Sequence, residues 1–469
     1  MDKTFHFVDT TQVDGSVRKA MRSHVMKGKN VGKTFRRPSR LDIARRQPHV
    51  YAALLRSTRA LNEEENSANP ESLCPTAIAR NIGNVFLTLP HPLALTSDAL
   101  KVVNQFFIYV AQKMYPSQLG LSSDDAMSVW LRFMCTDEAA SHCSIALMQT
   151  CNDFFIGDGA SSQMALHHLS QTFTLVNKRL QSNEALSDST LGIILLLMLQ
   201  EQIRNAKLET RIHYEGLRKM IELRGGLGQL EGNLPLLLKI CKTDITYALQ
   251  NGGPMIFFRD RMSEVRNTLL ERGFDFDRLS AASAIRHTGL NPCLHEVLLD
   301  VINVASLFNN IPTDQTLRIN TFEEIIVSIL SRLIRFRPLQ SSKRESNIEA
   351  AYHIGLIIFM MTLFLQYDNR RILEYDLVSL CLKDVLDSGL DEQERDLTLW
   401  LMFIGGIWVS GDTDGGWFIS KARRLLRRLS IKSWREVHNS VRKFPWIDAL
   451  HDRLGFVVWN LAYRESQIS

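Results

Sequence analysis

The chain has 469 residues, of which 45% are hydrophobic and 22% charged, and its formal net charge is +5. This ordinary globular composition excludes a largely disordered protein, and the length predicts two or three packed subregions. The seven cysteines are scattered without a C-x-x-C pair, which argues against a disulfide framework and favours a reducing compartment. We expect no secretory signal, because the segment 1–11 lacks an apolar core.

Positive charge is concentrated at the beginning of the chain. Residues 1–60 contain fourteen Lys or Arg and four acids, whereas the other 409 residues contain 41 bases and 46 acids. A basic segment joined to a slightly acidic body is typical of a nucleic-acid-binding or nuclear-import tail. A merely solvated tail is the alternative. The residues that we expect to contact phosphate or an importin are Lys27, Lys29, Lys33, Arg36, Arg37 and Arg40.

The same region differs from the rest of the chain in its hydrophobic pattern. Val17, Met21 and Val25 share one helical face, which predicts a short basic amphipathic helix over 16–27. Residues 28–48 carry Gly, Asn, Pro and Arg with few apolar side chains, and predict a flexible linker. We therefore predict a basic, largely flexible N-terminal arm over 1–75 and an all-helical body over 76–469.

Helical periodicity recurs along the whole body, and alternating strand patterns are nearly absent. The apolar run 354–365 has twelve residues, short of the roughly 18 that a membrane span needs, and predicts a buried core helix. No fixed repeat is found, so we expect an all-α antiparallel array rather than a regular solenoid. The predicted helices are 97–114, 137–155, 164–179, 189–206, 209–223, 234–249, 262–271, 294–308, 321–335, 348–367, 376–387, 392–408, 417–429 and 433–442.

Two glycine-rich stretches resemble ligand loops but favour simpler interpretations. The run 225–228 follows a predicted helix and has no Gly-Lys-Ser/Thr, so it predicts a helix end rather than a phosphate loop. The run 412–416 resembles part of a calcium loop. However, Trp417 and Phe418 stand where polar positions should follow, so a turn between two helices is favoured.

Catalytic and metal motifs are missing from the sequence. His167-His168 and the Cys293/His295 pair do not extend to a full ligand set, and no H-E-x-x-H or G-x-S-x-G is present. The adjacent acids Glu323 and Glu324 cannot be distinguished by spacing from a solvated helix face. We predict no catalytic residue, no metal site and no cofactor. The basic helix face at Arg423, Arg424, Arg427 and Arg428 could contact phosphate, but pairing with acids or simple solvation is favoured.

Several short segments together resemble the fungal-specific transcription factor regulatory domain, from about Phe5 to Trp459. The segments are Phe5-His6-Phe7-Val8, Val17-Arg18, Arg22-Ser23-His24-Val25-Met26, His213-Tyr214-Glu215-Gly216-Leu217, Arg224-Gly225-Gly226-Leu227, Asp244 and Phe444-Pro445-Trp446.

The resemblance implies a helical regulatory domain in a fungal nuclear protein. The family's DNA reader needs six clustered cysteines that hold two zinc ions, and this sequence has no cysteine before Cys74. We therefore expect a co-regulator of a metabolic or secondary-metabolite pathway without its own zinc-cluster reader. Its expected partners are DNA or importin at the arm, proteins at helix faces and a small effector between helices, with no membrane association. His213, Arg218, Arg224, Gly225 and Gly226 are expected to be structural.

Two alternatives stay open. A helical enzyme or accessory protein with an unrecognised pocket would show a buried cluster of titratable side chains with perturbed ionisation. A scaffold protein would expose a large apolar patch.

Overall fold

The computed structural model describes most of the helical body and none of the basic arm. The predicted helix over 16–27, the six cationic arm residues and the boundary between residues 75 and 76 lie outside the described residues, so these stay predictions. The described residues are 92–156, 162–274, 276, 289–312, 315–341, 346–363, 373–409 and 415–464.

All regular elements in these ranges are helices, and the only β-type pairing among them is an isolated bridge between Leu121 and Leu317. The all-α prediction is confirmed. No helix in the described ranges combines the length and the apolar character that a membrane crossing requires.

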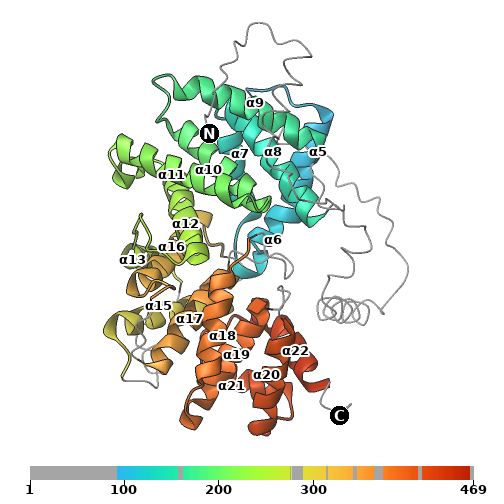
Figure 1. Ribbon diagram of the computed structural model, residues 1–469, viewed down its shortest axis with the longest axis vertical. Helices are drawn as coiled ribbons and strands as arrows, with labels where there is room; N and C mark the ends of the chain where they lie inside the picture. The colour runs from blue at the N-terminus through green and yellow to red at the C-terminus, as the bar shows by residue number, and fades with distance from the viewer. Residues whose placement is uncertain are drawn as a thin grey trace, which may run out of the picture. The chain divides into compact units, whose positions relative to one another are not determined.

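The first group of helices begins at residue 97 and packs as consecutive pairs, with α8 against α9 and α10 against α11 (Figure 1). Side-chain caps fix where these helices begin: Thr96, Ser122, Asp137 and Ser162 each accept a hydrogen bond from a backbone N–H in the first turn. The elements are α5 (Ser97–Gln105), the π-helix η1 (Phe106–Ala111), α6 (Gln112–Met114), η2 (Ser117–Leu119), α7 (Ser123–Met134), α8 (Glu138–Phe155), α9 (Gln163–Leu180), α10 (Asp188–Ile203), α11 (Lys207–Arg224) and η3 (Leu227–Leu230).

The second group connects the first group to the C-terminal helices. Helix α12 packs against α10 on one side and α16 on the other, and α16 in turn packs against α17 (Figure 1). These helices are apolar over much of their surface, as expected for elements with neighbours on several sides. The elements are α12 (Leu234–Asn251), α13 (Met262–Glu271), α15 (Pro292–Asn309) and α16 (Ile319–Phe336).

The C-terminal group surrounds α19, which packs against α17, α20, α21 and α22. Residues 354–362 of the apolar run are buried inside α17, which confirms the predicted core helix. Trp400 and Trp408 of α19 are fully buried. The elements are α17 (Asn347–Thr362), α18 (Asp376–Ser388), η4 (Glu392–Glu394), α19 (Arg395–Val409), α20 (Gly415–Arg428), α21 (Trp434–Val441) and α22 (Asp448–Arg464).

The predicted helix end at Gly225 is confirmed in detail. Gly225 adopts a left-handed conformation with φ of 102°, and its N–H donates to the Glu222 carbonyl at 3.1 Å. The N–H of Gly226 donates to the Ile221 carbonyl at 2.9 Å. This pair of bonds is the Schellman arrangement, which satisfies carbonyls at the end of a helix. The glycines therefore terminate α11 and form no phosphate cradle.

Two helices were not predicted from the sequence, α7 and α22, and the predicted helix 97–114 contains a π-helical segment in its middle. The predicted turn over 412–416 stays a prediction, because residues 410–414 lie outside the described part of the chain, while Gly415 and Gly416 form the start of α20.

Candidate ligand-binding site

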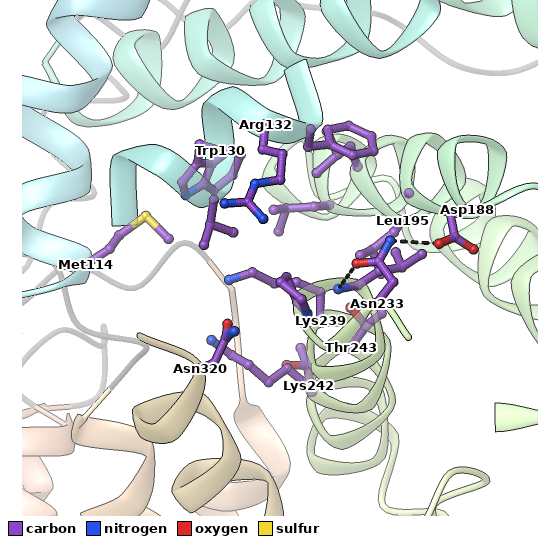
Figure 2. A pocket seen from close by; sticks show the side chains of 18 of the residues that line it. Met114, Trp130, Arg132, Asp188, Leu195, Asn233, Lys239, Lys242, Thr243 and Asn320 are labelled. Atoms are coloured by element: carbon purple, nitrogen blue, oxygen red, sulfur yellow. Dashed lines mark hydrogen bonds between the residues drawn. The ribbon is translucent and has the colours of Figure 1, made fainter. Parts of the chain in front are cut away.

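A cavity of about 580 Å³ lies among α7, α10 and α12. Figure 2 shows its side chains converging from these helices, with Asn320 of α16 at the same end as Lys242. Ligand cavities in proteins typically occupy about 300–1,000 Å³, so this volume suits a small molecule. Most of the wall is apolar: Val129, Phe133, Phe155, Leu195, Leu196, Leu199, Pro235, Leu236 and Leu373.

One end of the cavity carries two lysines that share a single buried carboxylate. Lys239 and Lys242 lie one turn apart on α12, and their ammonium nitrogens contact the same oxygen of Glu323, Oε1, at 2.5 Å and 3.2 Å. The Glu323 side chain is only 1% exposed. Tyr115 completes the cluster, because its hydroxyl accepts from Lys239 Nζ at 3.0 Å.

The electrostatics of this cluster keep Glu323 ionised and separate the two lysines. Burial alone would raise the pKa of Glu323, but the two ammonium groups outweigh burial and lower that pKa to about 2. Burial lowers the pKa of Lys242 to about 8, since repulsion from Lys239 adds to the cost of desolvation. Burial also opposes the charge of Lys239, but the closer contact with Glu323 prevails and raises the pKa of Lys239.

Helix α7 contributes a third cation from the other side of the cavity. The guanidinium of Arg132 extends from α7 toward the α12 lysines (Figure 2). Its side chain is exposed, and within the described residues no carboxylate forms an ion pair with it. The position of α7 is fixed by Asp125, whose carboxylate accepts from the backbone N–H of Ile319 at 2.8 Å and so caps the start of α16.

The opposite end of the cavity is held by a polar network at the start of α10. Asp188 pairs with Arg224 of α11 at 2.5 Å and accepts from the amide of Asn233 at 2.8 Å. Asn233 also caps α12 by accepting from Leu236 N at 3.4 Å, and Figure 2 shows both hydrogen bonds of Asn233. Asp188 is thus engaged in joining three helices. Arg224 compensates its negative charge, and the Asn233 amide donates a hydrogen bond to it.

The described lining of the cavity offers apolar surface and charge but no activated serine or cysteine. Among the described residues that line it, none is a histidine or a cysteine, so it has no Ser–His or Cys–His pair. Glu323 stays ionised at neutral pH and is occupied by two lysines. What the arrangement provides is apolar surface with positive charge at one end.

The structure decides a question about Glu323 and Glu324 that the sequence left open. Glu323 and Glu324 do not form a solvated face. Glu323 is buried in the lysine cluster, and Glu324 is 6% exposed and receives two hydrogen bonds from Arg259, at 2.8 Å and 2.9 Å. Spacing could not reveal this, because α16 has neighbours on most of its surface, α12, α13, α15 and α17 among them.

Two of the segments that carried the family resemblance, around Tyr214 and around Phe444, form packing centres outside the cavity, whereas those before residue 92 lie outside the described residues. Tyr214 donates to the Asp244 carboxylate at 2.5 Å, and the backbone N–H groups of Ile256 and Phe257 donate to its other oxygen at 2.8 Å and 2.6 Å. Asp244 therefore ties α11 and the segment after α12 to the middle of α12. This agrees with a structural role for the motif.

The C-terminal segment Phe444-Pro445-Trp446 forms a second packing centre. The ring of Phe444 stacks on Trp400 with centroids 5.4 Å apart, and the Pro445 carbonyl accepts from Trp400 Nε1 at 2.9 Å. Trp446 is buried, and its indole N–H donates to Asp452 at 2.7 Å.

The other residues singled out in the sequence are dispersed over the fold. Arg218 pairs with Glu215 and Glu222 on the surface of α11, and His213 is half-buried on the same helix. His168 lies against His142, with the two Nδ1 atoms 2.7 Å apart, and Cys293 is exposed. On α20 the side chains that face solvent are Arg424, Arg427 and Arg428, while Arg423 donates to the Ala462 carbonyl at 3.3 Å.

A three-residue cluster with metal-ligand side chains occurs at the end of the described chain, formed by His438, Asp448 and Asp452. His438 pairs with Asp452 at 3.1 Å and Asp448 pairs with Arg442 at 2.9 Å. These protein partners explain the cluster as an ion-pair network between α21 and α22.

The sequence alone does not single out Arg132, Lys239 and Lys242 as residues of a site. Lys239 and Lys242 lie in a correctly predicted helix, but nothing in the sequence distinguishes them from solvated lysines. Arg132 lies on the unpredicted helix α7. A signal for α7 was present, because Ser122 is followed by Asp124 and Asp125 in the first turn, and the Ser122 hydroxyl accepts from the N–H of Asp125.

The family comparison decides which class of protein contains this cavity. The family described as fungal specific transcription factor domain matches residues 101–444, nearly three quarters of the chain. The chain belongs to this family. No curated protein and no solved structure matches the chain. Every residue that lines the cavity falls inside the matched span, so the cavity is part of the fungal specific transcription factor domain itself. Membership supports a role in transcription regulation and points away from catalysis.

Proposed function

We propose that this protein is a nuclear co-regulator of transcription in a fungal metabolic or secondary-metabolite pathway, acting without a zinc-cluster DNA reader of its own. The observation that carries the proposal is the match of the fungal specific transcription factor domain to most of the helical body. In this proposal the domain receives a small effector in the cavity, and the basic arm provides nuclear import or contact with phosphate.

The described surface offers a place for protein partners. Leu208, Ile212 and Leu223 of α11 are 62%, 60% and 63% exposed, so this helix presents apolar side chains to solvent. Apolar groups gathered on a surface favour association with another protein. We propose that partner proteins bind at such helix faces, and that effector binding next to α10 and α12 alters the helices on which α11 packs.

Imaging and chromatin pull-down of the tagged full chain test the proposal. The intact protein should accumulate in the nucleus and associate with chromatin, and removal of residues 1–60 should abolish nuclear accumulation. A double substitution, Arg36→Ala with Arg37→Ala, should reduce it. The matched control is Arg427→Ala with Arg428→Ala, which removes the same charge from the exposed face of α20. Cytoplasmic residence of the intact protein without a chromatin signal contradicts the proposal.

The contribution of the arm to DNA contact is tested separately by salt dependence. Six cations that neutralise phosphates should cause the affinity for duplex DNA to fall by about 1,000-fold between about 50 mM and about 200 mM salt. Removal of residues 1–60 should eliminate this dependence. DNA binding that is independent of salt would contradict a phosphate-contacting arm.

A catalytic function is the second candidate, and one observation favours it. The Lys242 amine contacts the cavity and its pKa is lowered by burial to about 8, as in lysines that act as nucleophiles. Lys242→Arg separates the two roles, because arginine keeps the charge but cannot act as an amine nucleophile. Retention of transcriptional activity by Lys242→Arg supports regulation, whereas its loss with preserved folding and preserved anion binding supports amine chemistry.

A further inference from the structure

We propose that the cavity binds a small amphipathic acid, with its anionic group beside Lys239, Lys242 and Arg132 and its apolar body against the leucines of α10. This inference depends on the proposed function, because it names the chemical class of the effector. Three features of the cavity support it: the cations at one end, the engaged acids around it and its apolar walls.

The cationic end has the capacity to receive an anion. An ammonium group has three N–H donors, and Lys239 directs one to Glu323 and another to Tyr115. One donor of Lys239 is therefore left for a ligand. Lys242 lies beside it with its side chain 15% exposed, against 26% for Lys239. Both lysines are thus reachable from the cavity although their shared carboxylate is buried behind them.

Arg132 makes this end selective for an anion with two or more oxygens. A guanidinium forms paired hydrogen bonds with carboxylate or phosphate, and no carboxylate within the described residues occupies this one. Figure 2 shows Arg132 facing the α12 lysines across the cavity. An anion held between α7 and α12 would therefore bridge the two helices.

The acids that line the cavity do not neutralise this end. Asp125 accepts the Ile319 N–H at the start of α16, and Asp188 is paired with Arg224 and Asn233 at the other end. The described lining residues thus bring three cations to the site of the proposed anionic group, while both lining acids are engaged in holding helices together.

The walls define the rest of the ligand. Helix α10 is apolar on all sides and presents Leu195, Leu196 and Leu199 to the cavity, facing Val129 and Phe133 of α7. Burial of apolar surface contributes about 25 cal/mol per Å², so an alkyl or ring body would supply much of the affinity. A wholly polar anion would leave these apolar walls in contact with water, and a neutral hydrocarbon would bring no anionic group to the cationic end.

Calorimetric titration of the folded full chain with three probes tests this inference. The probes are decanoate, decyl phosphate and decanol, each used below its aggregation concentration. We expect at least one anionic probe to bind 10-fold or more tightly than decanol. The tighter of decanoate and decyl phosphate identifies the head group as carboxylate or phosphate. Equal affinity for all three, or no binding of either anion, overturns the inference.

Two substitutions locate the bound anion. Lys242→Met retains the Lys239–Glu323 pair, and Arg132→Met changes an exposed side chain, so both variants should fold. Each should reduce the preference for the anion over decanol by about 10-fold. The control is Lys219→Met on the exposed surface of α11, which should leave binding unchanged. An unchanged preference in Lys242→Met and in Arg132→Met overturns the assignment to this cavity.

The outcomes distinguish this inference from the proposed function. Loss of anion selectivity with nuclear accumulation and chromatin association intact would contradict only the effector class. Anion-selective binding by a protein that neither enters the nucleus nor associates with chromatin would contradict only the role in transcription.

Discussion

The C-terminal helices and the helices around the cavity differ in how fully side chains fill the space between them. Close approaches that require glycine occur in both regions, since a Cβ on Gly192 of α10 would lie 2.3 Å from the Phe133 ring of α7, but among the described residues around α19 no comparable space is left. A Cβ on Gly355 would lie 2.5 Å from the Trp400 ring, and one on Gly406 would lie 2.8 Å from both Phe418 and Val458. Large aromatic side chains fill the remaining space, so this region is packed at the density expected for a protein core.

Between α7, α10 and α12 the same type of apolar helix leaves a cavity of about 580 Å³ and buries charged groups beside it. Empty space and buried charge both reduce stability. The close packing of the C-terminal half shows that this chain can fill the space between its helices with side chains. This difference supports our proposal that the cavity region receives an effector, while the close-packed C-terminal region stabilises the fold.

The largest expected effect comes from the buried charge on the cavity side. Glu323→Ala leaves two lysines beside the cavity without their shared carboxylate, and it should lower the free energy of unfolding by about 3–5 kcal/mol. Urea denaturation measures this change. The control Glu264→Ala removes an exposed carboxylate and should leave the midpoint nearly unchanged. Similar midpoints for the two variants would show that the cluster is not structurally important.

The next effect tests the close packing of the C-terminal helices. Gly355→Ala places a methyl group against Trp400, which is fully buried and cannot move away easily, and it should cost about 1–3 kcal/mol. Gly216→Ala is the matched control. It lies within α11 with nothing within 4 Å, so alanine should stabilise the helix by up to about 1 kcal/mol. A neutral Gly355→Ala would contradict the comparison of the two regions.

Acid should destabilise the C-terminal region through its buried histidines. Burial lowers the pKa of His353 to about 4 and that of His451 to about 3, whereas an unfolded histidine titrates near 6.5. The unfolded state therefore binds more protons as the pH falls below about 6.5, and stability decreases. Between pH 7.5 and 5.5 each histidine should contribute a loss of about 1 kcal/mol.

The hydrogen bonds of His451 support its neutral form. Its Nδ1 accepts from the Ile447 N–H at 3.0 Å, and Nε2 lies 2.9 Å from the Thr362 hydroxyl, which itself donates to the Phe359 carbonyl. Protonation of Nδ1 would break the first of these bonds. Urea midpoints that stay constant between pH 7.5 and 5.5 would contradict the prediction.

The smallest expected stability change comes from partly filling the cavity. Leu196→Phe adds volume where the structure has space, so the free energy of unfolding should change by less than about 1 kcal/mol while affinity for the anionic probe falls about 10-fold. Leu401→Phe makes the same change in the closely packed region and should cost about 1–3 kcal/mol. Equal losses of unfolding free energy in the two variants would contradict the difference in packing between the two regions.

Local signals made much of this architecture predictable. The periodicity of α12, α13 and α18 and the glycine end at Gly225 depend on neighbours within a few residues, and the structure confirms them. Helix α7 was missed although its cap was visible and seven of its twelve residues are apolar. The π-helical segment within 106–111 has no sequence signal that we recognise.

The sequence by itself determined the helical class, most helix positions, the concentration of positive charge in residues 1–60 and the resemblance to the family, since each depends on local pattern or composition. Only the tertiary structure decided that Glu323 and Glu324 are buried, that Lys239 and Lys242 share one carboxylate, and that Arg132 faces them from another helix. The reason is physical. A side chain's exposure and ionisation are set by groups distant in sequence, such as the 84 residues that separate Lys239 from Glu323.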